Sequence, residues 1–407
     1  MKIKTTSISR RGFATALGGV PLALSLYDGT EALADDKPVN VTTVSVPGAG
    51  IQPQIATGPD GVIHLIYYKG DPGHGDLFYV RSRDEAVTFS APIRVNSQEG
   101  SAIAAGTIRG GQIALGRNGR VHVAWNGSNI AQPVGPVNPD SGKPGEPMLY
   151  TRLDDSGTKF EAQRNLMTST SGLDGGGSIA ADQSGGVYVA WHGRSPNAPK
   201  GERGRQVFLS RSTDDGKTFT TEKPVWDKPT GACGCCGLSI FASREGRLSI
   251  LFRSATEDVH RDIYLLNARP GSDSFSGGIL HRWDINACPM SSMSFNQGRG
   301  GTLATWETAG QVYFLPVDAN ASERSRPIAA SEEPAKRKHS YLATNSSGQT
   351  LMIWIEGSGW QKGGTLAWRM FDSTGKPISL VKTGSPTPTW SFGAPFARRD
   401  GGFTILY

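Results

Sequence analysis

The sequence predicts an all-β propeller built of four-stranded blades. Of its 407 residues, 53 are glycine and 25 are proline, a density of turn formers that excludes a helical bundle or a coiled coil. Hydrophobic residues make up 37% of the chain and charged residues 19%, which indicates a globular protein with a closed core rather than a disordered chain. A pair of strands recurs at intervals of roughly 50 to 65 residues, the length of one blade.

The repeated strands alternate β-branched and aromatic residues, most clearly in residues 121–127 and 187–193. Such alternation indicates half-buried strands. We count seven inner strand pairs, the last one incomplete, and therefore favour seven blades over six. The isolated strand in residues 39–46 is expected to complete the last blade, because this closure removes an open sheet edge.

The N-terminus resembles a twin-arginine export signal. Arg10 and Arg11 precede a short apolar stretch, and Ala32 and Ala34 are small residues suited to a signal peptidase. We expect residues 1–34 to be a signal peptide handled by the twin-arginine (Tat) export machinery, and residues 35–407 to form one periplasmic or secreted domain. An uncleaved anchor is the alternative, although the stretch is short for a bilayer span.

Charge and hydropathy exclude two classes of partner. The formal net charge of the chain is +6, but the basic residues are scattered, so the sequence predicts no nucleic-acid partner. No run after the signal approaches the ~18 apolar residues of a membrane helix. We therefore expect no membrane span in the mature chain.

An eight-residue string from Ser212 to Phe219 reads S-T-D-D-G-K-T-F. It matches the Asp box, S-x-D-x-G-x-x-F/W, and the chain therefore resembles the sialidase-like propellers, also known as BNR-repeat proteins. In this turn the aspartate can accept backbone N–H groups, the glycine takes a positive φ and the aromatic ring enters the blade. The resemblance implies a fold rather than an activity. Partial copies contain Asp155, Gly157 and Phe160, and Ser82, Asp84 and Phe89, with Ala86 in place of glycine.

Polar residues follow the second strand of successive blades. In a propeller these strand ends meet at one mouth of the central channel. His192 is one of them, and it is either a base or ligand or simply a hydrogen-bonded structural residue. The predicted mouth residues are Lys69, Asn126, His192, Arg253, Glu307 and Glu356.

All four cysteines fall at the same predicted mouth, in blade four and at the start of blade five. They belong to a set of motifs, C-x-C-C, R-D and W-x-I-x-x-C-P, that resembles a bacterial branch of Asp-box proteins labelled exo-sialidases. These motifs comprise Cys233, Cys235 and Cys236, then Arg261 and Asp262, then Trp283, Cys288 and Pro289.

Three states of the cysteines are compatible with the sequence. In an exported protein, four cysteines suggest two disulfides, with three possible pairings. Four sulfurs also suit Zn or Cu(I), with Met290 and Met293 as further soft ligands. A reactive thiol is the third alternative. The sequence therefore does not identify a cofactor: Cu or Zn at Cys233, Cys235, Cys236 and Cys288 is one candidate, and disulfides between these residues are the alternative.

The resemblance implies an exo-glycosidase whose partner is an anionic glycan or another small anionic ligand. Arginine would bind the ligand carboxylate, and carboxylates would supply acid and base. The first-blade arginine of sialidases is missing, since residues 51–55 read I-Q-P-Q-I, although Arg109 begins the second blade. The alternatives are a metal-binding or redox propeller and a non-catalytic binding or assembly module. The predicted catalytic residues are Arg253, Arg261, Asp262 and Glu307, and the predicted substrate-binding residues are His192, Asn126, Glu356 and Arg282.

Overall fold

The computed structural model describes residues 39–317 and 321–407. Contacts separate Val39–Tyr407, as one compact unit, from the residues before it. The expected signal peptide, residues 1–34, lies outside the described residues. Within the part of the chain that is described, no helix has the length and apolar character needed to cross a membrane.

The unit Val39–Tyr407 is a seven-bladed propeller, as the strand count predicted. Its described residues form six four-stranded sheets, one three-stranded sheet and a two-stranded ribbon. Blade one contains β2 (Ile51–Thr57), β3 (Ile63–Asp71), β4 (His74–Ser82) and β5 (Ile93–Arg94). Blade two contains β6 (Gln112–Leu115), β7 (Val121–Asn126), β10 (Met148–Arg152) and β11 (Arg164–Asn165), with the ribbon β8 (Val137–Asn138) and β9 (Lys143–Pro144) inserted between β7 and β10.

The remaining four-stranded blades repeat the same strand order. Blade three contains β12 (Ser178–Ala181), β13 (Val187–Gly193), β14 (Gln206–Ser212) and β15 (Lys223–Pro224). Blade four contains β16 (Ser239–Ala242), β17 (Leu248–Arg253), β18 (Ile263–Ala268) and β19 (Phe275–His281). Blade five contains β20 (Ser294–Gly298), β21 (Gly301–Thr308), β22 (Gln311–Val317) and β23 (Ile328–Ala329). Blade six contains β24 (Arg337–Thr344), β25 (Thr350–Glu356), β26 (Thr365–Phe371) and β27 (Lys382–Pro386).

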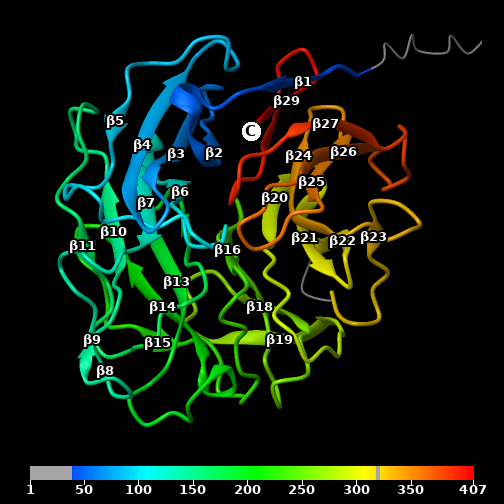
Figure 1. Cartoon of the computed structure of the whole chain (residues 1–407). Helices are drawn as coiled ribbons and strands as arrows, with labels where there is room; N and C mark the ends of the chain where they lie inside the picture. The colour runs from blue at the N-terminus through cyan, green and yellow to red at the C-terminus, as the bar shows by residue number, and fades with distance from the viewer. Residues whose placement is uncertain (1–38, 318–320) are drawn as a thin grey trace, which may run out of the picture. The chain divides into compact units, whose positions relative to one another are not determined.

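Blade seven closes the ring with strands from both ends of this unit. Its strands are β28 (Ala394–Ala397), β29 (Phe403–Leu406) and β1 (Val41–Val44). Strand β1 pairs in parallel with β29, with Val41 opposite Phe403, and the two lie side by side in Figure 1. The predicted closure by the N-terminal strand is therefore confirmed. Three short 3-10 turns complete the described structure: Pro47–Ala49, Arg117–Gly119 and Glu202–Gly204.

Apolar side chains fill the spaces between neighbouring blades. Trp125, Trp191, Trp306 and Trp354 sit near the ends of equivalent strands and are fully buried. Trp125, for example, belongs to a cluster that also contains Tyr68 of blade one. Each such ring buries about 150 to 250 Å², so these tryptophans hold the blades together.

The Asp-box turns form as predicted in blades one and three. In blade three, Asp214 Oδ1 accepts hydrogen bonds from the Ser212 hydroxyl (2.7 Å) and the Thr218 N–H (2.9 Å). In blade one, Ala86 adopts the positive φ of 70° that glycine usually takes.

The blade-two turn differs from its predicted register by one residue. The carboxylate that accepts the Thr158 N–H (3.3 Å) is that of Asp154. Asp155, the predicted residue, forms an ion pair with Arg120 instead.

Candidate functional site

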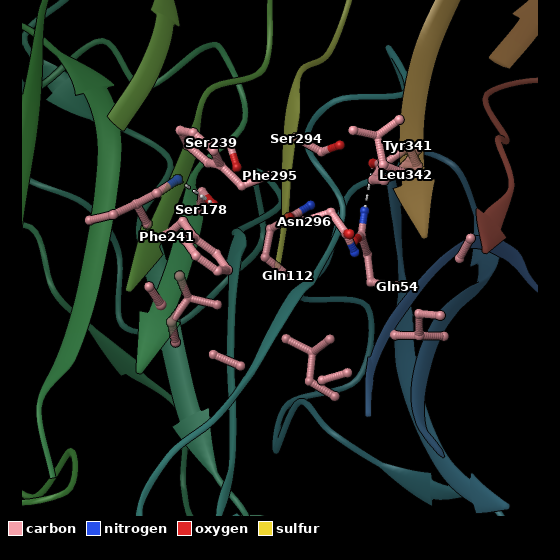
Figure 2. A pocket seen from close by; sticks show the side chains of 18 of the residues that line it. Gln54, Gln112, Ser178, Ser239, Phe241, Ser294, Phe295, Asn296, Tyr341 and Leu342 are labelled. Carbon is pink, nitrogen blue, oxygen red and sulfur yellow. Dashed lines mark hydrogen bonds between the residues drawn. The ribbon is translucent and has the colours of Figure 1, made fainter. Parts of the chain in front are cut away.

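The first strands of all seven blades line a central channel. It encloses a cavity of about 520 Å³, within the usual range of a small-ligand pocket. Figure 2 shows the Gln54 amide directed toward the Tyr341 hydroxyl, 2.8 Å away. The lining residues that the structure describes are uncharged, with amides and hydroxyls such as Gln112, Ser178 and Asn296 among apolar groups. The channel itself therefore offers no charged group to hold an anion.

The four cysteines gather in the loops that precede blades four and five. Cys233, Cys235 and Cys236 lie in the loop between β15 and β16, and Cys288 lies in the loop between β19 and β20. A disulfide joins Cys235 to Cys288 across 53 residues of sequence and links the loops that precede blades four and five. Gly237, the next residue after Cys236, lines the channel.

Two free thiols lie beside this disulfide. Cys233 and Cys236 are unpaired and fully buried. The Cys233 Sγ is 3.3 Å from the Cys235 Sγ and 3.4 Å from the Cys236 Sγ. Cys288 is exposed and Cys235 is partly exposed. Of the three states compatible with the sequence, the one with two disulfides is therefore wrong for this structure, which has one disulfide and one buried dithiol.

The backbone fixes the cysteine loop to blades four and five. The Cys233 N–H donates to the Arg253 carbonyl (2.9 Å), at the end of β17. The Cys236 N–H donates back to the Cys233 carbonyl (3.3 Å), so the four residues form a tight turn. The Gly237 N–H donates to the Ser291 carbonyl (2.9 Å), just before β20.

Arg253 and Glu307 form a buried ion pair behind this loop. Their side chains approach to 3.3 Å, with 0% and 2% of each side chain exposed. Arg253 also donates to the Arg261 carbonyl (2.8 Å) and to the Glu307 carbonyl, and its guanidinium lies 5.0 Å from the centre of the Trp283 ring. Its hydrogen-bond partners Arg261 and Glu307 are themselves buried.

Arg261 and Asp262 occupy the same region, but their side chains contact different partners. Arg261 contacts Glu202, at 2.7 Å, and the other oxygen of Glu202 accepts the Gly234 N–H (2.6 Å) inside the cysteine loop. Asp262 accepts the Trp283 N–H (2.9 Å). Glu202 therefore connects a blade-three loop to the cysteine loop and to Arg261.

The positive and polar surroundings alter the acidity of the two thiols. Burial opposes ionisation of Cys236, but the hydrogen bond from Cys233, the charge of Arg253 and the Ser291 N–H outweigh it and lower the pKa of Cys236 to about 7. The hydrogen bond to Cys236 and burial raise the pKa of Cys233. Burial likewise raises the pKa of Glu307, against the opposing effect of Arg253.

The other predicted mouth residues lie at the expected strand ends, mostly in internal contacts. Asn126 bridges Gly175 O (3.0 Å) and Gly177 N (3.2 Å), and Glu356 accepts from Arg337 (2.9 Å). His192 is fully buried, neither ring nitrogen has a hydrogen-bond partner, and burial lowers its pKa to about 3. Arg282 instead directly follows the outermost strand β19 and forms an exposed ion pair with Glu323 (2.8 Å).

Sequence reasoning missed two acidic residues of this region. Asp174 contacts both Arg109 (2.6 Å) and Arg205 (3.2 Å), and Glu202 holds Arg261. Both acids lie in loops outside the repeated strands, so the register of the strand repeat could not predict that they lie near the mouth. A lone acidic residue in a polar loop carries no sequence signal that could have identified its partner.

No family model matches the chain, and no curated protein matches it in sequence. Solved structures do resemble it. The Hadza microbial sialidase Hz136 superposes with a TM-score of 0.50 at 13% identity, covering 76% of this chain and 64% of the sialidase. This chain therefore spans a little less than two thirds of that protein.

Two further structures cover most of both chains. The α-L-arabinanase of Penicillium chrysogenum, complexed with arabinobiose, has a TM-score of 0.50 at 13% identity and covers 83% of this chain and 98% of its own. The intramolecular trans-sialidase of Ruminococcus gnavus, in complex with oseltamivir carboxylate, has a TM-score of 0.51 at 10% identity and covers 81% and 95%. At such low identity these likenesses establish the propeller fold alone.

Proposed function

We propose that the protein is a thiol-disulfide redox protein whose centre is the four-cysteine cluster. The observation that carries this proposal is the position of a free thiol, Cys233, 3.3 Å from a sulfur of the Cys235–Cys288 disulfide. A disulfide opens when a thiolate attacks one of its sulfurs. The exposed Cys288 gives an external dithiol access to the disulfide, whereas the buried pair is shielded.

The redox reaction exchanges two electrons with a partner of the dithiol class. One external thiolate attacks Cys288, the Cys235–Cys288 bond breaks, and Cys235 leaves as a thiolate and is protonated. The second external thiol then attacks the mixed disulfide and releases Cys288 as a thiol. The partner ends as a disulfide, and the protein holds four thiols.

A redox titration tests this function. Free thiols in the denatured protein should number two as isolated and four after reduction. In buffers of defined thiol-disulfide ratio, the Cys235–Cys288 bond should open reversibly at a potential above about −300 mV, the limit below which structural disulfides of secreted proteins usually lie. A disulfide that stays closed at that potential is a structural cross-link, and the proposed redox function is then wrong.

A metal site is a second candidate for the same sulfurs. The Sγ atoms of Cys233, Cys235 and Cys236 lie within 4.8 Å of one another, and reduction of the disulfide would free Cys288 as a fourth donor. Thiolates are the ligands that Zn and Cu(I) prefer. Metal analysis of protein purified without reductant or chelator distinguishes the candidates: one metal per chain with four thiols after its removal favours the metal site.

The hydrolase hypothesis rests on the fold likeness to sialidases and arabinanases. In that hypothesis Arg253 and Arg261 bind an anionic glycan, and Asp262 and Glu307 supply acid and base. The geometry supports it less well, because at most 5% of each of these four residues is exposed. Activity on a panel of sialosides and other acidic glycans, abolished by Glu307→Gln, would favour it over the redox function.

Export to the periplasm or beyond remains part of the proposal and depends on the signal-like residues 1–34. An oxidising compartment maintains disulfides such as Cys235–Cys288. Replacement of Arg10 and Arg11 by lysine should retain the protein in the cytoplasm, as cell fractionation would show. Export that continues unchanged would contradict the twin-arginine assignment.

A further inference from the structure

We infer that the buried dithiol and the exposed disulfide exchange with each other, so that one disulfide moves between the pairs Cys235–Cys288 and Cys233–Cys236. This inference rests on the proposed redox function and adds an internal step to it. Cys233 is the attacking sulfur, and Cys288 is the sulfur that leaves. The buried thiols then supply two electrons, which the exposed pair Cys235 and Cys288 passes to an external partner.

The four sulfurs form a continuous chain with Cys235 and Cys233 in the middle. Cys288 is bonded to Cys235, Cys233 lies 3.3 Å from Cys235, and Cys236 lies 3.4 Å from Cys233. Each successive exchange therefore needs only a short movement of one side chain. The exposure of the sulfurs falls along the same chain, from exposed Cys288 to fully buried Cys236.

The local backbone permits both new bonds. Residues two apart in an extended or turning chain have Cα atoms about 5 to 7 Å apart, a separation that a disulfide can bridge. The turn closed by the Cys236 N–H and the Cys233 carbonyl (3.3 Å) brings residues three apart within the same reach. Cys235 and Cys236 are adjacent in the chain and pair poorly, so Cys233 is the natural intermediary.

The exchange balances without an outside reagent. In the first step the Cys233 sulfur bonds to Cys235, the Cys235–Cys288 bond breaks, and its electron pair leaves on Cys288, on which the Cys233 proton ends. In the second step the Cys236 sulfur bonds to Cys233, the Cys233–Cys235 bond breaks, and the Cys236 proton ends on Cys235. One disulfide and two thiols are present before and after.

Kinetic trapping with N-ethylmaleimide tests the exchange in the folded, full-length protein. The reagent captures Cys288 whenever exchange releases it, and chelator excludes metal. Trypsin then places Cys288 in the peptide of residues 283–299 and the other cysteines in that of residues 218–244. Tandem mass spectrometry should find the label on Cys288 and Cys235, with Cys233 and Cys236 joined.

Two variants separate the steps. Cys233→Ser removes the attacking sulfur, so labelling of Cys288 should slow at least tenfold. Cys236→Ser keeps the first step, so Cys288 should still be labelled, but Cys233 should now be joined to Cys235. Thermal unfolding curves that match the wild type confirm that each variant is folded, and either variant alone gives a readout.

Label found on Cys233 and Cys236 with Cys288 unlabelled would overturn the exchange. Equal labelling rates of Cys288 in the wild type and in Cys233→Ser would overturn it as well, because the disulfide would then open by another route. In both cases a thiol count of two and a reversible redox titration would leave the proposed redox function standing. A disulfide that resists reduction in that titration would instead remove the redox function itself.

Discussion

Glu222 and Glu307 are both almost completely buried, yet their surroundings shift their pKa values in opposite directions. Glu222, with 5% exposed, accepts the N–H groups of Thr168 (2.9 Å), Ser169 (2.8 Å) and Thr170 (2.9 Å). Burial opposes its ionisation, but these bonds and the Thr168 hydroxyl outweigh burial and lower its pKa to about 2. Glu307 accepts the Gly310 N–H (2.8 Å) and faces Arg253, and burial raises its pKa.

Under the proposed redox function, this difference in pKa shift distinguishes a structural carboxylate, Glu222, from one beside the proposed reactive centre, Glu307. Glu222 lies next to the outermost strand of blade three and ties it to the preceding loop with a fully satisfied carboxylate. Glu307 lies behind the cysteine cluster. There burial opposes its ionisation, and Arg253 is its charged partner. Residues whose pKa values are perturbed by burial and by a charged partner concentrate at functional sites. The raised pKa of Glu307 beside the cysteines therefore agrees with a functional centre there rather than in the uncharged channel.

Among the substitutions that test this comparison, Arg253→Met is expected to have the largest effect on the free energy of unfolding. Arg253→Met leaves the Glu307 carboxylate buried without its charged partner and two carbonyl oxygens without their donor. Removing one member of a buried pair costs about 3 to 5 kcal/mol. Urea unfolding of wild type and variant at pH 7 measures the change.

Arg282→Met is the matched control, because Arg282 forms an exposed pair with Glu323. An exposed pair contributes about 0 to 1 kcal/mol. Equal losses in the two variants would show that the Arg253–Glu307 pair has no special energetic role, and the contrast between the two glutamates would lose its basis.

The repeated strands could be predicted from the sequence because each blade is encoded by local alternation and by turns of a few residues. The Asp box of blade three is a good example, since Ser212, Asp214 and Thr218 bond to one another within seven residues. Closure by the N-terminal strand followed from the same count, because an unpaired strand at one end matched an incomplete blade at the other.

The mouth region was predictable only in part. The repeat register brought Cys288 beside the Cys233–Cys236 loop, to which the disulfide joins it, and Arg253 beside the same loop. It could not assign Glu202 to Arg261, because ion pairs across loops depend on the path of the loop backbone. It also could not decide the state of the cysteines, because the choice of which sulfurs pair depends on distances of a few ångströms between side chains.

Glu222→Gln tests the structural member of the comparison. Hydrogen bonds to a charged acceptor contribute about 1.5 to 3 kcal/mol each, and the amide keeps some of them, so we expect a loss of about 1 to 3 kcal/mol at pH 7. The folded-state pKa of Glu222 is lowered, so its stabilisation is complete above the unfolded-state pKa and disappears as the pH falls toward about 2. Unfolding free energies of variant and wild type should therefore converge between about pH 5 and pH 2. A gap that stays constant over this range would contradict the assignment.

Glu307→Gln should have the smallest effect at neutral pH and the opposite pH dependence. Arg253 keeps its hydrogen bonds to the Arg261 and Glu307 backbone carbonyls, so it is not left without partners as Glu307 is in Arg253→Met. The amide oxygen still accepts the Gly310 N–H, and the variant no longer ionises a buried group, so we expect a change of about 1 kcal/mol or less at pH 7. Because the folded-state pKa of Glu307 is raised, the stability contributed by its protonated form is present at low pH and is lost as the pH rises through that pKa. The wild type should therefore lose stability relative to Glu307→Gln as the pH rises from about 4 toward the folded-state pKa of Glu307. Parallel slopes for Glu307→Gln and Glu222→Gln would mean that both carboxylates are simple structural acceptors, and the charge of Glu307 would then have no distinct part in the environment of the thiols.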